Sequence, residues 1–128
     1  MIKIDSLFSG LRKVKQFESL SSEDLNQILN SGQIKKFIPG QVIFLQEEPS
    51  AGMFVLIEGK VNLCKLGPLG QQNILATIHP IIMFNEVAVL DCGKNPVTAI
   101  AIQETTLWHI DCDTFQSLLK RFPEIGLG

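Results

Sequence analysis

The side chains that could do chemistry are few and widely spaced in this chain of 128 residues. One of the two histidines, His79, stands in the segment Ile78–Phe84, whose other residues are all apolar. An imidazole among apolar side chains is what an axial haem ligand requires, so His79 is a candidate haem ligand. The alternative is a structural histidine in a turn, because Pro80 follows it. His109 lies beside Trp108 in an apolar run and is interpreted as structural.

Nothing in the sequence is typical of an enzyme. Glu47 and Glu48 are expected in a solvated turn, and no serine–histidine–aspartate arrangement or nucleophile elbow accompanies them. The cysteines Cys64, Cys92 and Cys112 lack the close spacing of zinc or iron–sulfur ligands. We therefore expect three free thiols in a reducing compartment, either buried or incidental. The alternative is a redox switch, for which Cys92 is the candidate because it lies in a polar loop.

Composition restricts the function further. Hydrophobic residues make up 45% of the chain, which excludes disorder, and the formal net charge is -2. Only Arg12 and Arg121 are arginines, which argues against a chain that reads nucleic acid. No apolar run is long enough to span a bilayer, and the N-terminus lacks the apolar stretch of a signal peptide. We expect a soluble, cytoplasmic protein with no membrane association.

The elements that must position these residues are indicated by hydrophobic spacing. Residues 7–32 are predicted to be helical, with Ser21 and Asp24 resembling a capping box and Gly32 as a helix stop. Residues 34–111 contain short apolar runs separated by turn signals about every ten residues, which is typical of an all-β sandwich or barrel. The runs are 34–37, 42–45, 53–57, 61–66, 74–78, 98–102 and 106–110.

Two shorter segments complete the pattern. A single helical turn fits residues 86–90, before a polar loop. After residue 111 the chain is predicted to become helical again, with Asp113 at the N-cap or first position of the helix. Pro123 is expected to interrupt this helix.

Three segments, in this order and at these separations, resemble the cyclic nucleotide-binding domain, above all the sensor domain of Crp/Fnr transcription regulators. They are residues 37–44, residues 53–61, and residues 84–90 followed by 96–99. The resemblance implies a mainly β fold, a double-stranded β-helix or jelly roll with flanking N- and C-terminal helices. It divides a single domain, 1–128, into N-terminal helices (1–33), a β-roll (34–111) and the start of a C-terminal helix (113–128).

In that family a short helix and the loop after it bind a cyclic phosphate. The ligand-binding residues implied by the resemblance are Asn85, Glu86, Val87, Ala88, Val97, Thr98 and Ala99. Glu86 matches the glutamate that binds the ribose, and Thr98 matches a hydroxyl donor. Asn85 stands at a glycine position and tolerates a left-handed backbone. Structural alternatives are a helix-start acid for Glu86 and a strand-opening residue for Thr98.

The arginine that grips the phosphate in the family is replaced here by Val97. One charge-assisted hydrogen bond contributes about 1.5–3 kcal/mol, so affinity for a cyclic phosphate should fall by about two decades or more. Ile81 and Ile82 replace a glycine and an acid. We therefore expect a small-molecule effector other than cyclic AMP. The alternatives are cyclic AMP or cyclic GMP binding, a haem-based gas sensor, and a ligand-free protein-interaction module.

The resemblance also implies partners. Family members bind DNA through a C-terminal helix-turn-helix, which is absent from this chain, and act as homodimers. We expect the full-length regulator to be a homodimer and this chain to be its effector-sensing part or a natural stand-alone domain. We do not expect it to be an enzyme.

Overall fold

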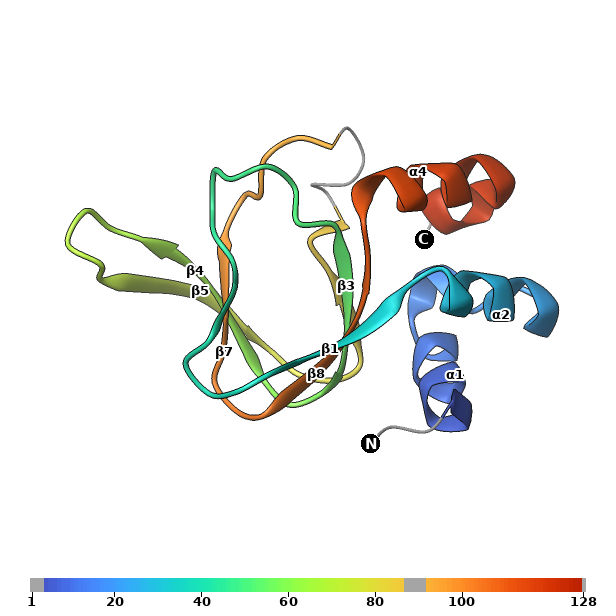
Figure 1. Cartoon of the computed structure of the whole chain (residues 1–128), viewed down its shortest axis with the longest axis horizontal. Helices are drawn as coiled ribbons and strands as arrows, with labels where there is room; N and C mark the ends of the chain where they lie inside the picture. The colour runs from blue at the N-terminus through green and yellow to red at the C-terminus, as the bar shows by residue number, and fades with distance from the viewer. Residues whose placement is uncertain (1–3, 87–91, 128) are drawn as a thin grey trace.

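The computed structural model describes residues 4–86 and 92–127 (Figure 1). The helices are α1 (Ile4–Arg12), the 3₁₀ helix η1 (Lys15–Phe17), α2 (Ser22–Asn30), α4 (Cys112–Arg121) and the 3₁₀ helix η2 (Pro123–Leu127). The strands are β1 (Gln33–Phe37), β2 (Val42–Phe44), β3 (Met53–Glu58), β4 (Val61–Leu66), β5 (Gln72–Ile78), β6 (Ile82–Phe84), β7 (Thr98–Ala101) and β8 (Thr105–Ile110). Among these residues, no helix has the length and apolar character needed to cross a membrane.

Two four-stranded sheets form the β-roll, in the orders β1-β8-β3-β6 and β2-β7-β4-β5, and neighbouring strands are antiparallel. Each predicted apolar run contributes a strand, so the predicted jelly roll with flanking helices is confirmed. Strand β6 is not predicted from the sequence, because its three residues belong to an apolar run in which polar and apolar residues do not alternate. β6 forms by pairing with β3, where Phe84 lies opposite Phe54.

Strands β3 and β8 are buried on both faces, and their alternating side chains enter two separate cores. In β3, Met53, Val55 and Ile57 pack with the helices, whereas Phe54 and Leu56 pack inside the β-roll. The helices cover one side of the roll, next to β1, β3 and β8 (Figure 1). This burial on both faces explains why β3 reads as an unbroken apolar run.

Trp108 of β8 joins the helices to the sheet. Its side chain is fully buried, and its indole Nε1–H donates to the Leu29 carbonyl at 3.1 Å. The ring of Phe17 meets it edge-on, with centroids 6.4 Å apart. A Cβ at Gly32 would lie 2.4 Å from the indole, and the Gly32 backbone is not left-handed. The helix α2 ends at Asn30 just before Gly32, as predicted, and the absence of a side chain at Gly32 leaves the space that Trp108 occupies.

The helix ends follow from polar side chains beside them. The Ser21 hydroxyl accepts from the Asp24 backbone N–H at 3.1 Å, which confirms the predicted cap of α2. The predicted position of Asp113 in α4 is wrong, because Asp111 is the N-cap and its carboxylate accepts from the Thr114 N–H at 2.8 Å. Asp111 can cap α4 because it directly follows β8 and keeps the extended backbone that an N-cap residue has. As predicted, α4 ends before Pro123.

Gly32→Ala should destabilise the fold by about 1–3 kcal/mol, because the added methyl group overlaps the Trp108 indole. Gly10→Ala is the matched control. Gly10 lies inside α1, where a Cβ would meet only ordinary contacts at 3.4 and 3.6 Å, so this substitution should stabilise by about 0.5–1 kcal/mol. Urea unfolding followed by tryptophan fluorescence measures both. Equal effects of the two substitutions would contradict the packing role given to Gly32.

Candidate functional site

A cavity of about 280 Å³ opens between strands of the two sheets, at the segments that the sequence analysis singles out. Its lining residues are Phe44, Leu63, Ile78, Ile82, Met83, Phe84, Asn85, Glu86, Pro96 and Val97. Eight of these ten side chains are apolar, and none is a lysine or arginine. The predicted residues Asn85, Glu86 and Val97 meet at this cavity, whereas Val87 and Ala88 lie outside the described residues.

Stacked aromatic rings build one wall of the cavity. The rings of Phe44 and Phe54 have centroids 5.5 Å apart, and those of Phe54 and Phe84 lie 5.4 Å apart. The three come from β2, β3 and β6, so the stack spans both sheets. Offset stacking of this kind adds about 0.5–1.5 kcal/mol per pair beyond burial. The wall is therefore held in place before any ligand binds.

Asn85 turns the chain at the end of β6. Its backbone is left-handed, with φ at 66°, the conformation that the family's glycine position requires. Its Nδ2 donates to the Gly52 carbonyl at 2.8 Å and to Asn95 Oδ1 at 3.1 Å. These bonds hold the residue between the segment before β3 and the loop before β7.

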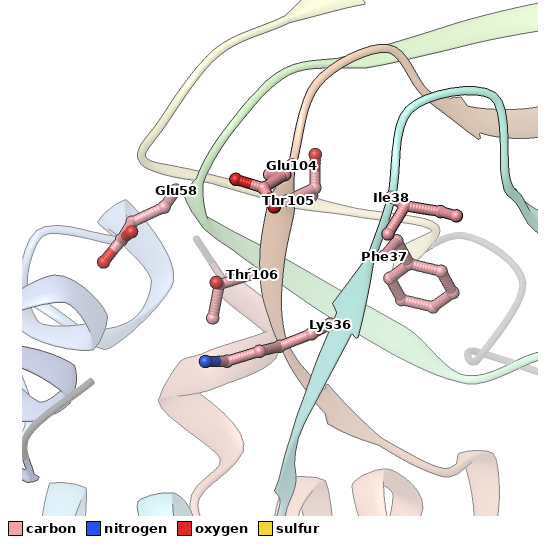
Figure 2. Close-up of a pocket in the computed structure, with 7 residues that line it drawn as sticks. All are labelled: Lys36, Phe37, Ile38, Glu58, Glu104, Thr105 and Thr106. Atoms are coloured by element: carbon pink, nitrogen blue, oxygen red, sulfur yellow. The ribbon is translucent and has the colours of Figure 1, made fainter. Parts of the chain in front are cut away.

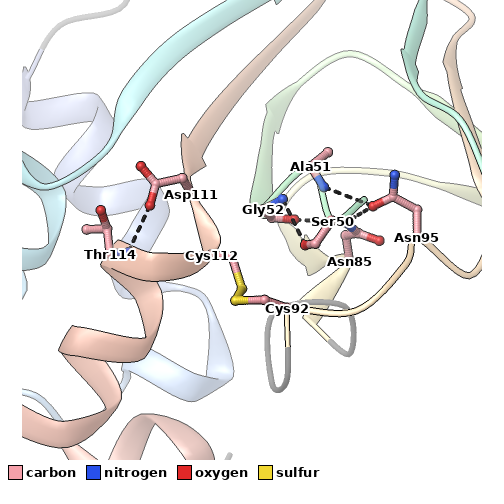
Figure 3. The surroundings of a disulfide bond; sticks show 9 residues. All are labelled: Ser50, Ala51, Gly52, Asn85, Cys92, Asn95, Asp111, Cys112 and Thr114. Atoms are coloured by element: carbon pink, nitrogen blue, oxygen red, sulfur yellow. Dashed lines mark hydrogen bonds between the residues drawn. A yellow bond between two sulfur atoms is a disulfide. The ribbon is translucent and has the colours of Figure 1, made fainter. Parts of the chain in front are cut away.

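Asn95 connects three segments beneath the cavity, and the sequence analysis does not single it out. Its side chain is 1% exposed. Oδ1 accepts from the Ala51 N–H at 3.0 Å (Figure 3). Nδ2 donates to the Leu45 carbonyl at 2.9 Å. In the sequence Asn95 stands in an ordinary polar loop. Its role depends on residues about 45–50 positions away, which local pattern does not reveal.

Among the residues that the structure describes, two buried acceptor atoms have no hydrogen-bond partner. They are Oδ1 of Asn85 and Oε2 of Glu86, both on residues that line the cavity. An unpaired buried acceptor costs about 1–3 kcal/mol. A ligand that brings hydroxyl or amine donors to these atoms would satisfy them. The polar part of the cavity therefore matches a hydrogen-bond donor.

Thr98 and Ala99 lie behind the cavity wall, not among its lining residues. The Thr98 hydroxyl donates to Gln46 Oε1 at 3.0 Å and accepts from the Gln46 N–H at 3.0 Å. Its donor is thus engaged within the sheet, and ligand binding by Thr98 would require this bond to be exchanged. Ala99 is fully buried among the phenylalanines of the β-roll core. Val97, by contrast, is half-buried and faces the cavity.

The haem hypothesis does not fit the structure. His79 is exposed in the turn between β5 and β6 and does not line the cavity. Within the described residues, no group of three or more histidine, cysteine or acidic side chains is placed to hold a metal ion. An axial haem ligand must point into an enclosed apolar pocket, so no step of the function is assigned to haem.

The prediction of three free thiols is wrong. Cys92 and Cys112 form a disulfide with Cα atoms 5.7 Å apart (Figure 3). Only Cys64 is free, and burial raises the pKa of its thiol. β8 returns the chain to the loop that contains Cys92, so that two cysteines 20 positions apart meet. Sequence spacing carries no sign of this contact.

A second hollow of about 380 Å³ lies at the β1–β8 side of the roll. Its lining residues are Lys36, Phe37, Ile38, Glu58, Glu104, Thr105 and Thr106. The charged side chains spread apart and do not converge on one point (Figure 2). None of its lining residues carries one of the unpartnered buried polar atoms found in the described chain. We therefore place the candidate site at the smaller cavity.

A two-sheet β-roll with an inner ligand cavity and flanking helices defines a class of effector-sensing regulatory domains. The model of the cyclic nucleotide-binding domain matches residues 34–122, and the chain belongs to this family. This confirms the resemblance that the three sequence segments carry. Like the related domains, the chain is accordingly a regulatory domain and not an enzyme.

The similarity extends to regulators and to their solved sensor domains. The cyclic AMP receptor protein of Thermus thermophilus is 28% identical over 110 residues, which are 86% of this chain and 51% of that protein. The sensor domain of the transcriptional regulator DNR from Pseudomonas aeruginosa is 26% identical with a TM-score of 0.84, covering 96% of this chain and 83% of that one. Potassium channel SKOR of Arabidopsis thaliana is 26% identical over 112 residues, 88% of this chain and 14% of the channel. The chain spans about half the length of the curated regulators it matches.

His109 of β8 contacts the segment before β3 that also bonds to Asn95. Its Nε2–H donates to the Ala51 carbonyl at 2.6 Å, and its ring lies 4.6 Å from that of Phe54. Burial lowers the pKa of His109 below its ordinary value of 6.5, and Lys35 lowers it further. The bond to Ala51 and the charge of Asp111 act in the opposite direction. Burial prevails, so the folded protein favours the neutral imidazole.

The lowered pKa of His109 predicts a loss of stability in mild acid. Below pH 6.5 the unfolded chain takes up a proton that the folded imidazole resists, so the free energy of unfolding falls until pH reaches the folded-state pKa. The slope cannot exceed about 1.4 kcal/mol per pH unit for one group. Urea unfolding between pH 8 and pH 5 measures it. His109→Gln should flatten this part of the profile. The same slope in the variant and the wild type would refute this assignment.

Proposed function

We propose that this chain senses a small, largely apolar effector in the cavity between its two sheets, and that the effector is not cyclic AMP. The observation that carries the proposal is the lining of that cavity. By its resemblance to the family, Val97 stands at the position of the phosphate-binding arginine, and none of the described residues that line the cavity is cationic. The volume of about 280 Å³ also supports a ligand-binding function over a collapsed, ligand-free interaction module.

The charge of the cavity opposes a phosphate. Glu86 contributes a carboxylate with one buried, unpartnered oxygen, and a bound phosphate would add a second anion near it. Two buried like charges without a cation repel each other and lose their hydration. An apolar molecule with a hydroxyl or amine group has neither cost, because its donors complement Glu86 and Asn85. The effector class that fits best is therefore neutral or cationic, apolar in bulk, and a hydrogen-bond donor.

Cyclic nucleotide binding is the second candidate, and one contact favours it. Lys65 of β4 donates to the carbonyl of Pro96 at 2.5 Å, and Pro96 lines the cavity. A rotation of the lysine side chain would bring a positive charge to the cavity rim. Lysine acts there as a single point charge, whereas an arginine binds a phosphate with two parallel hydrogen bonds. We therefore rank this candidate below the apolar effector.

We propose a wider role for the chain from the regulators to which it is similar. The relatives of which this chain covers about half include regulators named as transcriptional. We extend the proposal to a cytoplasmic, homodimeric regulator in which this chain is the single sensor domain. DNA binding would then belong to a separate domain, and the response to the effector would pass through α4.

Wild-type protein should bind cyclic AMP at least about 100-fold more weakly than Val97→Arg does, because the guanidinium restores two charge-assisted hydrogen bonds. Isothermal titration calorimetry measures both affinities. Val97→Leu is the matched control and should show no gain. Micromolar one-to-one binding of cyclic AMP by the wild type would overturn the proposed effector class.

The neutral aromatic amine N-phenyl-1-naphthylamine tests the cavity directly. Its fluorescence should rise saturably at one probe per chain, since the probe is apolar and carries one N–H donor. Val97→Trp should abolish this binding by filling the cavity. Probe binding that Val97→Trp leaves intact would contradict an effector site at this position.

A further inference from the structure

The Cys92–Cys112 disulfide joins two parts of the molecule that the proposed function assigns to sensing and to response. Cys92 is exposed and opens the loop that ends at Val97 in the cavity lining. Cys112 is the first residue of α4, directly after the N-cap Asp111. The two sulfur atoms lie between the loop and the helix in Figure 3. Oxidation therefore ties the cavity loop to the start of α4.

The loop after Cys92 is already fastened by hydrogen bonds. Asn95 is held by the Ala51 N–H and the Leu45 carbonyl, and the Gly93 carbonyl accepts from the Ser50 N–H at 2.8 Å. With the disulfide formed, Cys92 is in addition tied covalently to the start of α4. With the disulfide reduced, the helix end loses its covalent restraint. The oxidation state of this pair thus changes the freedom of a segment that shapes the cavity.

The two thiols have the surroundings that reversible exchange requires. The exposure of Cys92 allows an external thiol or disulfide to reach its sulfur. Cys112 stands at the N-terminus of a ten-residue helix, whose dipole favours a thiolate. Cys64 differs in both respects, since it is buried and burial raises its pKa. The chain therefore contains one exchangeable pair and one protected thiol.

We propose that Cys92 and Cys112 are a reversible thiol–disulfide site that couples the effector cavity to α4. The oxidant is a low-molecular-weight disulfide of the glutathione class. The Cys92 thiolate attacks it, forms a mixed disulfide and releases one thiol. The Cys112 thiolate then attacks the Cys92 sulfur and releases the second thiol. Two cysteine thiols lose two electrons and two protons in total, and one small disulfide becomes two small thiols.

The site is tested first without any effector. Protein equilibrated with oxidised glutathione, then unfolded and treated with N-ethylmaleimide, should gain the mass of one label, and dithiothreitol-treated protein the mass of three. Hydrogen exchange of the amides in 112–116 and 92–97 should be at least about 10-fold faster after reduction. The melting temperature should fall by roughly 10 °C, as loss of a 20-residue cross-link predicts. Three labels in the oxidised sample, or equal exchange in both states, would overturn the proposal.

The coupling of the disulfide to the cavity rests on the proposed function, and it is tested separately by the affinity for a probe. Oxidised protein should bind N-phenyl-1-naphthylamine at least about 5-fold more tightly than reduced protein, because the cavity loop is restrained in advance. Cys92→Ser should remove the difference, whereas Cys64→Ser should retain it. Equal affinities in both redox states would refute the coupling. Probe binding in neither state would instead refute the apolar cavity, and the labelling and exchange results would still decide the redox site.

Discussion

Strand β8 imposes the constraint on which the rest of the structure depends, because its consecutive side chains enter two different cores. Trp108 points to the helices and Leu107 into the β-roll. The indole is enclosed by the ring of Phe17, the carbonyl of Leu29 and the bare backbone of Gly32. A shift of one residue in the register of β8 would place Trp108 in the β-roll core and Leu107 against the helices. The register of β8 therefore fixes the position of the helices relative to the cavity.

The same strand supports the candidate site. His109 faces the β-roll, contacts Phe54 and donates to the carbonyl of Ala51. On either side of that carbonyl, the Ala51 N–H donates to Asn95 and the Gly52 carbonyl accepts from Asn85. A short series of neutral hydrogen bonds thus carries the position of β8 to the edge of the cavity. The arrangement needs no buried ion pair, which suits a site whose chemistry is mostly apolar.

The cavity illustrates how one family fold can hold different chemistry. The framework of the cyclic nucleotide-binding domain is preserved, including a left-handed residue at Asn85 and an acid at Glu86. Val97 lines the cavity of this chain, and the proposal of a ligand other than a cyclic phosphate rests on that side chain. Function in such folds resides in the side chains of the site and not in the arrangement of strands. The loop that carries Val97 also begins at a cysteine bonded to α4, so changes at the cavity have a short covalent path to the helix.

Local sequence was sufficient for most of the secondary structure. Apolar runs between turn signals predict each strand except β6, since strand pattern arises from nearest neighbours along the chain. The role predicted for Val97 rests on a short motif of fixed spacing, and the structure places this residue in the cavity lining. Asn95, the Cys92–Cys112 disulfide and the reason for Gly32 depend on residues that are distant in sequence. Only the packing of β8 against the helices and of the loops around Ala51 brings those partners together. Exposure likewise is a tertiary property, which is why the apolar neighbours of His79 did not make it a buried ligand.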